Sequence, residues 1–329
     1  MTAVGNIIIP IKSETYNRLF FAPFLQDKMM FDVFQVFSDM RATEKKQMLK
    51  LGNFSRKTRR ASGCGFNPVG DTSVTERWLE TIGTKIEAEL CWDELKYGAL
   101  APQIGQGNNY DRIENTQIST AIAFKIGQGA MQDAMELAFY GDTNSSNPFF
   151  NVVDGLWKYF QVGVTNGEIK QFSDKSNTPL KTGEAIELMR KVYKGASKEL
   201  RGTASSEKIF FVSPDIFYQL QDDLSAGLNG ADTYTIEVLD GRDIIRFYGV
   251  EIRCMESWGE LGESQLGLDQ AQNLIVYTRR NNFVIGTDGT GMNADVMMEW
   301  QAFQRKVRYR LARPMGFNYI HPELIAIHR

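Results

Sequence analysis

The chain has 329 residues, of which 43 % are hydrophobic and 23 % are charged. These proportions are typical of a folded protein of about two domains and exclude a chain that is disordered throughout. Its 37 basic and 40 acidic residues give a formal net charge of −3, which argues against a protein dedicated to coating DNA or RNA. No run of about 18 apolar residues is present, so we expect no membrane-spanning helix.

Residues that commonly carry catalysis or bind metals are scarce. The three cysteines, Cys64, Cys91 and Cys254, form no CxxC pair, which favours free thiols in a reducing compartment. The two histidines, His321 and His328, lie in the last nine residues, which excludes a histidine-rich metal site and disfavours a nucleophile–base pair. Phosphate-binding glycine loops, zinc spacings and hydrolase motifs are absent. We therefore expect no enzyme activity, no catalytic residue, no metal and no cofactor.

The first 97 residues divide by composition and charge. Residues 1–40 are rich in phenylalanine, with a spacing that fits a helix or a strand, and suit core packing or an arm over a neighbouring subunit. Residues 41–60 hold eight basic residues and one acidic residue, whereas residues 71–97 hold seven acidic and three basic ones. Opposite charges of this kind pair within a chain or between copies, and a basic run also suits phosphate groups. The alternation over 72–90 predicts a long hairpin or an extended loop.

The longest predicted helix covers residues 115–140. Asn115 or Thr116 suits the N-cap, and apolar residues then recur at a spacing of three to four. Gly141 stands where a helix commonly ends, and residues 142–148 have the composition of a turn.

The second half of the chain alternates predicted helices and strands. A helix over 182–200, capped by Thr182, precedes a strand over 208–212. Ser213 and Pro214 then predict the N-cap and first residue of another helix. Strands over 233–239 and 242–254 are joined at Asp240-Gly241, a strong hairpin signal, and a further strand covers 273–277.

Residues 295–312 have a two-residue period that predicts one long strand. Phe303, Val307, Tyr309 and Leu311 lie on one side, and three basic residues lie on the other: Lys306, Arg308 and Arg310. Such a basic face suits the solvated side of a sheet, a phosphate-bearing partner or an acidic neighbour.

Four segments, in order, resemble the major capsid protein of tailed bacteriophages, the Hong-Kong-97-like fold family. The first is the turn over 138–157, where the long helix ends in Gly141 and the chain leads through a polar loop into Gly155-Leu-Trp157. The others are the strand and helix over 209–220, the strand over 247–253, and the strand over 273–277 together with the closing segment 316–327. The resemblance covers residues 60–329.

This resemblance implies an α+β fold with an N-terminal arm, an extended loop, a peripheral domain with a long spine helix, and an axial domain. We expect the arm and first peripheral strands in 1–59, the extended loop in 60–97, and the peripheral domain with its spine helix in 98–149. We expect the axial domain in 150–275 and the closing strands in 276–329.

The implied function is structural. A major capsid protein assembles as hexamers and pentamers into an icosahedral shell around double-stranded DNA, assembled in the host bacterial cytoplasm and located in the virion. Expected partners are identical subunits, a portal, separate scaffold or decoration proteins, and non-specific contacts with packaged DNA, without a membrane. An encapsulin-like compartment that encloses enzyme cargo is the main alternative, although such shells begin with an amphipathic helix that residues 2–10 do not suggest. An unrecognised α/β enzyme is a third possibility.

Two groups of residues are candidates for the interactions of such a shell. The candidates for contacts between subunits are Arg56, Lys57, Arg59, Arg60, Asp71, Glu76, Glu80, Lys85 and Glu87. The basic candidates for contact with DNA are Lys306, Arg308 and Arg310. Whether residues 41–60 face DNA or an acidic loop of a neighbour remains open at this point.

Overall fold

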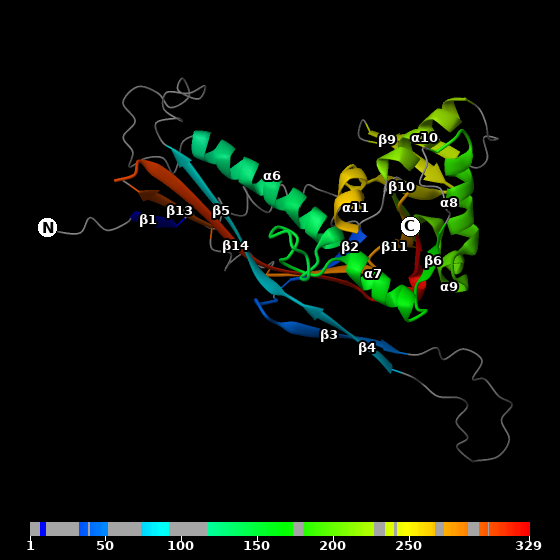
Figure 1. The fold of residues 1–329 in the computed structure, drawn as a ribbon, viewed down its shortest axis with the longest axis horizontal. Helices are drawn as coiled ribbons and strands as arrows, with labels where there is room; N and C mark the ends of the chain where they lie inside the picture. The colour runs from blue at the N-terminus through cyan, green and yellow to red at the C-terminus, as the bar shows by residue number, and fades with distance from the viewer. Residues whose placement is uncertain are drawn as a thin grey trace, which may run out of the picture.

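The chain contains two β-sheets, a two-stranded ribbon and several helices (Figure 1). The computed structural model describes residues 7–10, 33–38, 40–51, 74–91, 117–173, 180–226, 234–239, 242–266, 273–288, 296–301 and 303–329. Helices and strands mix along the chain, which confirms the predicted α+β class. Among the described residues, no helix is both long and apolar enough to cross a membrane.

The first sheet is built around one long strand, β14 (Lys306–Tyr319). Its first half pairs with β13 (Val296–Gln301) on one side and β5 (Ile82–Cys91) on the other. Its second half pairs with β12 (Phe283–Thr287), which pairs in turn with β2 (Phe34–Phe37). Strand β1 (Ile7–Pro10) pairs with β13. Helix α6 (Gln117–Tyr140) runs alongside this sheet, as Figure 1 shows.

The second sheet has seven strands, and helices lie on both of its faces. Its order is β6 (Lys170–Phe172), β15 (Ile325–His328), β11 (Ile275–Arg279), β7 (Lys208–Val212), β10 (Val250–Cys254), β9 (Arg242–Phe247) and β8 (Tyr234–Leu239). The helices are α7 (Leu156–Thr165), α8 (Glu184–Gly195), α9 (Lys198–Gly202), α10 (Pro214–Ser225) and α11 (Trp258–Leu266). Short 3-10 turns cover Ser205–Glu207 and Pro322–Leu324.

Strand β7 divides the core between the two faces of the seven-stranded sheet. Phe210 and Val212 pack under α8 and α10. Ile209 and Phe211 face the other way and join a cluster that includes residues of α6, α7, α11 and the first sheet. Because alternate residues of a strand point to opposite faces, one apolar strand links both halves of the core.

Several predicted elements are confirmed. Helix α6 begins and ends within two residues of the predicted 115–140, and β7 matches 208–212. Ser213 is the N-cap of α10 and Pro214 is its first residue, as the sequence indicated. Strands β8 and β9 form the predicted hairpin.

The predicted single strand over 295–312 is wrong, because the chain reverses within it. Strands β13 and β14 form an antiparallel hairpin, and Arg305 has a φ of +52° at the turn. The period of two continues on both arms, so the pattern alone did not reveal the turn. Phe303 consequently lies in the turn and is 87 % exposed, instead of lying on the buried face of a strand.

Of the two structures predicted for residues 72–90, a long hairpin or an extended loop, the hairpin is wrong. Strand β4 (Val74–Glu80) is followed at once by β5, and the two pair with different partners. Strand β4 pairs with β3 (Lys45–Leu51) to form the ribbon, whereas β5 pairs with β14. Thr81 separates them, and its backbone bonds Thr43 and Glu44, which ties the end of β4 to the start of β3.

One predicted helix and one predicted strand are each divided into two elements in the structure. The helix over 182–200 splits into α8 and α9, because Ser197 caps α9 by accepting a hydrogen bond from the N–H of Leu200. The N-cap of α8 is Gly183 instead of Thr182, and the buried carboxylate of Asp223 accepts its N–H. The strand over 242–254 splits into β9 and β10 at Tyr248-Gly249, which both have positive φ, as type I′ turns require.

Candidate assembly surfaces

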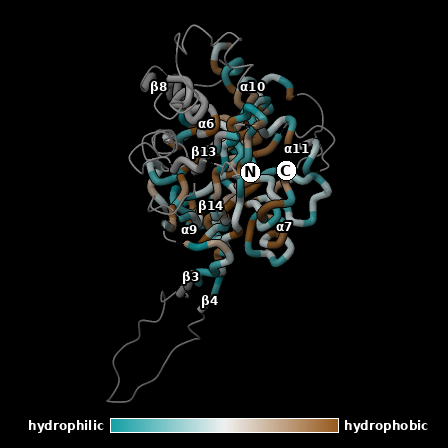
Figure 2. The backbone as a smooth tube through the Cα atoms, turned by 90° about the vertical axis from the view of Figure 1, so that its left-hand side faces the viewer, coloured by the Kyte–Doolittle hydropathy of each residue, from teal (hydrophilic) through white to brown (hydrophobic). Residues whose placement is uncertain are grey.

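The β3–β4 ribbon projects away from both sheets, as Figures 1 and 2 show. Its register runs from Lys45 opposite Glu80 to Leu51 opposite Val74. The Lys45 ammonium lies 2.9 Å from the Glu80 carboxylate, so the opposite charges of the two predicted segments meet here within one chain. Glu76 and Glu80 lie on the exposed side of β4. The candidates Arg56, Lys57, Arg59, Arg60 and Asp71 lie outside the described residues.

The base of the ribbon contacts the body through one face. Met48 and Leu79 form a small apolar cluster with Met40 and Val284. The amide of Asn318 donates a 2.7 Å hydrogen bond to the carbonyl of Trp78. The outward face carries Trp78, whose side chain is 50 % exposed.

Arg77 adds a polar contact to this base. Its guanidinium lies 4.5 Å from the centre of the Tyr319 ring and forms an ion pair with Glu168 at 2.5 Å. No local pattern predicts this contact, because the three residues are far apart along the chain.

Strands β5 and β14 bring together residues that the sequence analysis treated as two groups. Glu89 accepts hydrogen bonds from Lys306 and, at 2.7 Å, from Nε of Arg308. Glu87 accepts a 2.9 Å hydrogen bond from its neighbour Lys85, and its carboxylate lies 3.7 Å from Arg310. We call these six side chains the charge ladder. The acidic neighbour of the basic strand is therefore β5 of the same chain.

The charge ladder holds its carboxylates in the ionised form. The hydrogen bond from Lys306, followed by that from Arg308, lowers the pKa of Glu89. The hydrogen bond from Lys85 lowers the pKa of Glu87, and the charge of Arg310 adds to the effect. A polyanion approaching β14 meets carboxylates as well as cations, which weakens its attraction.

The turn after α6 closes on itself. The N–H of Gly155 donates a 2.7 Å hydrogen bond to the carbonyl of Gly141. A Cβ atom on Gly141 would lie 2.2 Å from the carbonyl oxygen of Val153, so the turn requires glycine at this position. These are the residues on which the capsid resemblance first depended.

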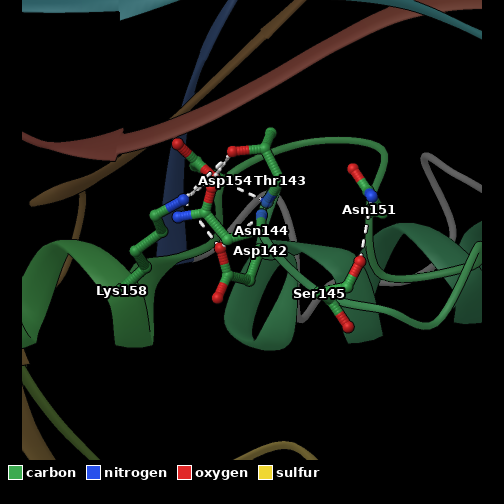
Figure 3. Close-up of polar contacts among 7 residues, drawn as sticks. All are labelled: Asp142, Thr143, Asn144, Ser145, Asn151, Asp154 and Lys158. Atoms are coloured by element: carbon green, nitrogen blue, oxygen red, sulfur yellow. Dashed lines mark hydrogen bonds and ion pairs between the residues drawn. The ribbon is translucent and has the colours of Figure 1, made fainter.

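A lysine clamp fastens this turn to α7 (Figure 3). The Lys158 ammonium lies 2.6 Å from Asp154 and 2.7 Å from Asp142. Asp154 also accepts hydrogen bonds from the N–H and hydroxyl of Thr143, at 2.9 and 2.8 Å. Burial alone would raise the pKa of Asp154, but the bonds from Lys158 and Thr143 outweigh it and lower the pKa. The spacing of four between Asp154, just before the start of α7, and Lys158 in its first turn was a signal that the sequence analysis did not use.

The described residues offer little to enzyme chemistry. No group of three or more His, Cys, Asp or Glu side chains among them is arranged to hold a metal ion. A gap between α6 and the first sheet has a volume of 10 Å³, room for about one water molecule. Cys91 and Cys254 are free thiols, and burial raises the pKa of Cys254 to about 12, so this thiol is a poor nucleophile. Cys64 lies outside the described residues.

Comparison with known proteins identifies the fold. No family profile matches the sequence, and neither does any curated protein. The structure, however, is similar to a capsid chain of the satellite phage P4 procapsid that includes the size determination protein. The TM-score is 0.56 at 10 % identity, and the match covers 94 % of this chain and 98 % of that chain. The chain has the Hong-Kong-97-like capsid fold.

Chains from two further solved structures have the same fold as this chain. The capsid of an empty GTA particle matches with a TM-score of 0.52 at 11 % identity, covering 100 % of this chain and 93 % of that chain. The SrpI encapsulin of Synechococcus elongatus matches with a TM-score of 0.51 at 10 % identity, covering 92 % and 86 %. The resemblance deduced from the sequence is thus confirmed as a fold, and the fold is common to phage capsids and encapsulins.

Proposed function

We propose that this chain is a shell protein, and specifically the major capsid subunit of a tailed phage. It would assemble as hexamers and pentamers into an icosahedral shell that encloses double-stranded DNA. The observation that carries the proposal is the match to the phage P4 procapsid chain, which spans nearly the full length of both chains.

The shape of the chain supports assembly with copies of itself. The ribbon extends beyond the body and presents Trp78 and the acidic side chains Glu76 and Glu80 on its outward face. An exposed aromatic residue among charges is typical of interface anchors, for which Trp is enriched. Many copies making such heterologous contacts close into a shell.

The N-terminal part of the described chain contributes a strand to the first sheet. Residues 7–10 form strand β1, which pairs with β13 with Ile7 opposite Trp300. A capsid subunit of this kind is located in the virion, with portal, scaffold and decoration proteins as further partners.

The charge ladder is consistent with weak, sequence-independent contact with DNA. Lys306, Arg308 and Arg310 remain the candidates for that contact, but each of them faces a carboxylate of β5. Because DNA affinity depends mainly on phosphates that meet unpaired cations, the expected affinity is low. Packaged DNA would then leave the shell without a large energetic cost.

Electron microscopy of the purified protein, with light scattering, tests the proposal. We expect shells, tubes or six-fold rings of megadalton mass, either from the chain alone or after a scaffold is supplied. A stable monomer or dimer under both conditions would contradict the proposal. Shells that enclose enzyme cargo would instead favour the encapsulin alternative.

A shortened variant provides the matched control. Replacing residues 49–76 by an Asn-Gly turn removes the outer ribbon but leaves Lys46, Leu79 and both sheets in place. We expect this variant to retain the helical circular dichroism of the full chain and to remain unassembled. Shell formation by the shortened variant would show that the part of the ribbon beyond Met48 and Arg77 is not required for assembly.

A further inference from the structure

The direction of the ribbon depends on few contacts. Strand β4 has seven residues, so the ribbon extends about 20 Å from its base, and a rotation of ten degrees would move its end by about 4 Å. Contacts at the base therefore decide where the outward face meets another molecule.

Side chains on the inward face of the ribbon alternate with exposed ones. Along β4, Arg77 and Leu79 turn toward the body, whereas Glu76, Trp78 and Glu80 are exposed. Met48 lies directly opposite Arg77 in the register and packs with Leu79 in the apolar cluster. Apolar packing is non-directional, so this cluster holds the ribbon against the body without fixing its angle.

Arg77 supplies a second directional contact, in addition to the hydrogen bond that Asn318 donates to the Trp78 carbonyl. Its guanidinium carbon lies over the Tyr319 ring, 4.5 Å from the ring centre, and Nη2 donates a 2.5 Å hydrogen bond to Glu168. The Arg77 side chain is only 18 % exposed. Contacting a ring face and bonding a carboxylate at the same time constrains the arginine side chain through its planar, forked guanidinium, which a lysine ammonium does not have.

Both partners of Arg77 are themselves held by the body. Tyr319 is the last residue of β14 and is 1 % exposed. Glu168 lies three residues after Thr165, the last residue of α7. Its N–H donates to the carbonyl of Gly163, and the N–H of Gly167 donates to that of Val164. With Gly167 at a φ of +71°, this is a Schellman motif, so the helix end fixes the backbone of Glu168.

We propose that Arg77 is a positioning residue that holds the ribbon at one angle to the body by bridging Tyr319 and Glu168. The ribbon is thereby oriented in the free subunit before it meets a second copy, which lowers the ordering cost of association. The angle between the ribbon and the body is a property of the single chain. Its benefit for assembly rests on the proposed function.

Distance measurements between spin labels test the proposal in the full chain. One label replaces Glu76 on the ribbon and the other replaces Glu187 on α8, both exposed positions, after the three native cysteines have been changed to serine. Labelled protein is diluted into an excess of unlabelled protein, so that only distances within one chain are measured. The unmodified ribbon should give one narrow distance distribution.

Four variants distinguish the bridge from a general effect of charge. Losing a charge-assisted hydrogen bond shifts an equilibrium by about tenfold or more, so R77Q and E168Q should each increase the displaced fraction about tenfold. R77K keeps the charge but loses the planar guanidinium, so it should also broaden the distance distribution. K45A removes a pair that lies within the ribbon, Lys45–Glu80, and should leave the distribution unchanged.

The outcomes separate this inference from the proposed function. Unchanged distances in R77Q and E168Q, or equal broadening in K45A, would overturn the role of Arg77 whether or not shells form. Broadening in R77Q, E168Q and R77K, but not in K45A, supports that role even if the unmodified chain never assembles. If the chain does assemble, R77Q should give a lower yield of closed shells than K45A.

Discussion

Strands β7 and β4 differ in what holds them in place. All five residues of β7 are buried, and its side chains pack on both faces of the seven-stranded sheet. In β4, by contrast, every second described side chain is exposed, and its contacts with the body are one apolar cluster, one amide bond and the Arg77 bridge. The body is therefore stabilised by apolar burial, whereas the ribbon is oriented by a few polar groups. Variants in the body should change stability, and variants in the ribbon should change orientation and assembly.

The largest effect is expected at Phe211. Its ring is fully buried and lies 5.9 Å from the Phe139 ring and 6.1 Å from the Phe283 ring. F211A should lower the free energy of unfolding by about 3–5 kcal/mol, because it opens a cavity where the two sheets and α6 meet. Urea denaturation followed by circular dichroism measures the change.

Phe303 provides the matched control for Phe211. Its ring is 87 % exposed in the β13–β14 turn, so F303A should leave the free energy of unfolding unchanged. If both variants lost the same stability, the central core would not lie where β7 places it.

The next comparison is between Gly129, inside α6, and Gly141, directly after its last residue. G141A should cost about 3 kcal/mol, because the added Cβ would lie 2.2 Å from the carbonyl oxygen of Val153. Nothing lies within 4 Å of a Cβ added to Gly129, so G129A should stabilise the helix by about 1 kcal/mol. Thermal denaturation of the two variants measures both signs, and a stabilising G141A would contradict the closed turn.

The sequence predicted local elements better than it predicted pairing. Helix α6, the cap at Ser213 and the β8–β9 hairpin follow from spacing and turn chemistry within a few residues. The partner of β5 depends on which distant strand has matching charges and apolar spacing, and alternation does not encode this. For the same reason the β13–β14 turn was missed, since alternation continues through it.

For the candidate surfaces too, the sequence indicated which residues matter but not which of them pair. Charge counting found the acidic and basic residues of the charge ladder but did not show that they face one another in one chain. The Arg77 bridge joins residues 77, 168 and 319, which meet only after the fold has formed. Contacts of this kind depend on tertiary geometry that no local pattern carries.

Asp154 should give a smaller, pH-dependent effect. Its folded pKa is lowered, so its contribution is complete above the ordinary aspartate pKa of about 4 and is lost as the pH falls through the lowered value. D154N should lower the free energy of unfolding by about 2 kcal/mol at pH 7, because the asparagine loses the charge that Lys158 bonds. Urea denaturation of the wild type and D154N should give curves that converge as the pH falls from 5 to 2.

The exposed Asp222 on α10 serves as the control for Asp154. D222N should follow the wild type at every pH, since no lysine clamp holds that carboxylate. A stability difference for D154N that stayed constant down to pH 2 would contradict an ionised, bonded Asp154.

The smallest effect on stability, and the sharpest test of the DNA-facing candidates, is expected at the charge ladder. Glu87 and Glu89 are solvent-exposed, so the double variant E87Q/E89Q should unfold like the wild type. Removing both carboxylates leaves the β14 cations free to meet phosphates. The log–log dependence of DNA affinity on salt should then become steeper by about one to two units, one for each added phosphate contact.

A second double variant distinguishes the effect of losing the charge-ladder carboxylates from the effect of a changed net charge. E187Q/E199Q changes the net charge equally but at exposed positions on α8 and α9. Fluorescence anisotropy with a random-sequence duplex, measured over a range of salt concentrations, compares the two. Equal slopes for both variants would show that the strand's basic face has no particular role toward DNA. A steeper slope for E87Q/E89Q alone would mean that β5 masks a phosphate-binding strand, so that the body, and not only the ribbon, has a surface whose interactions are set by a few exposed charges.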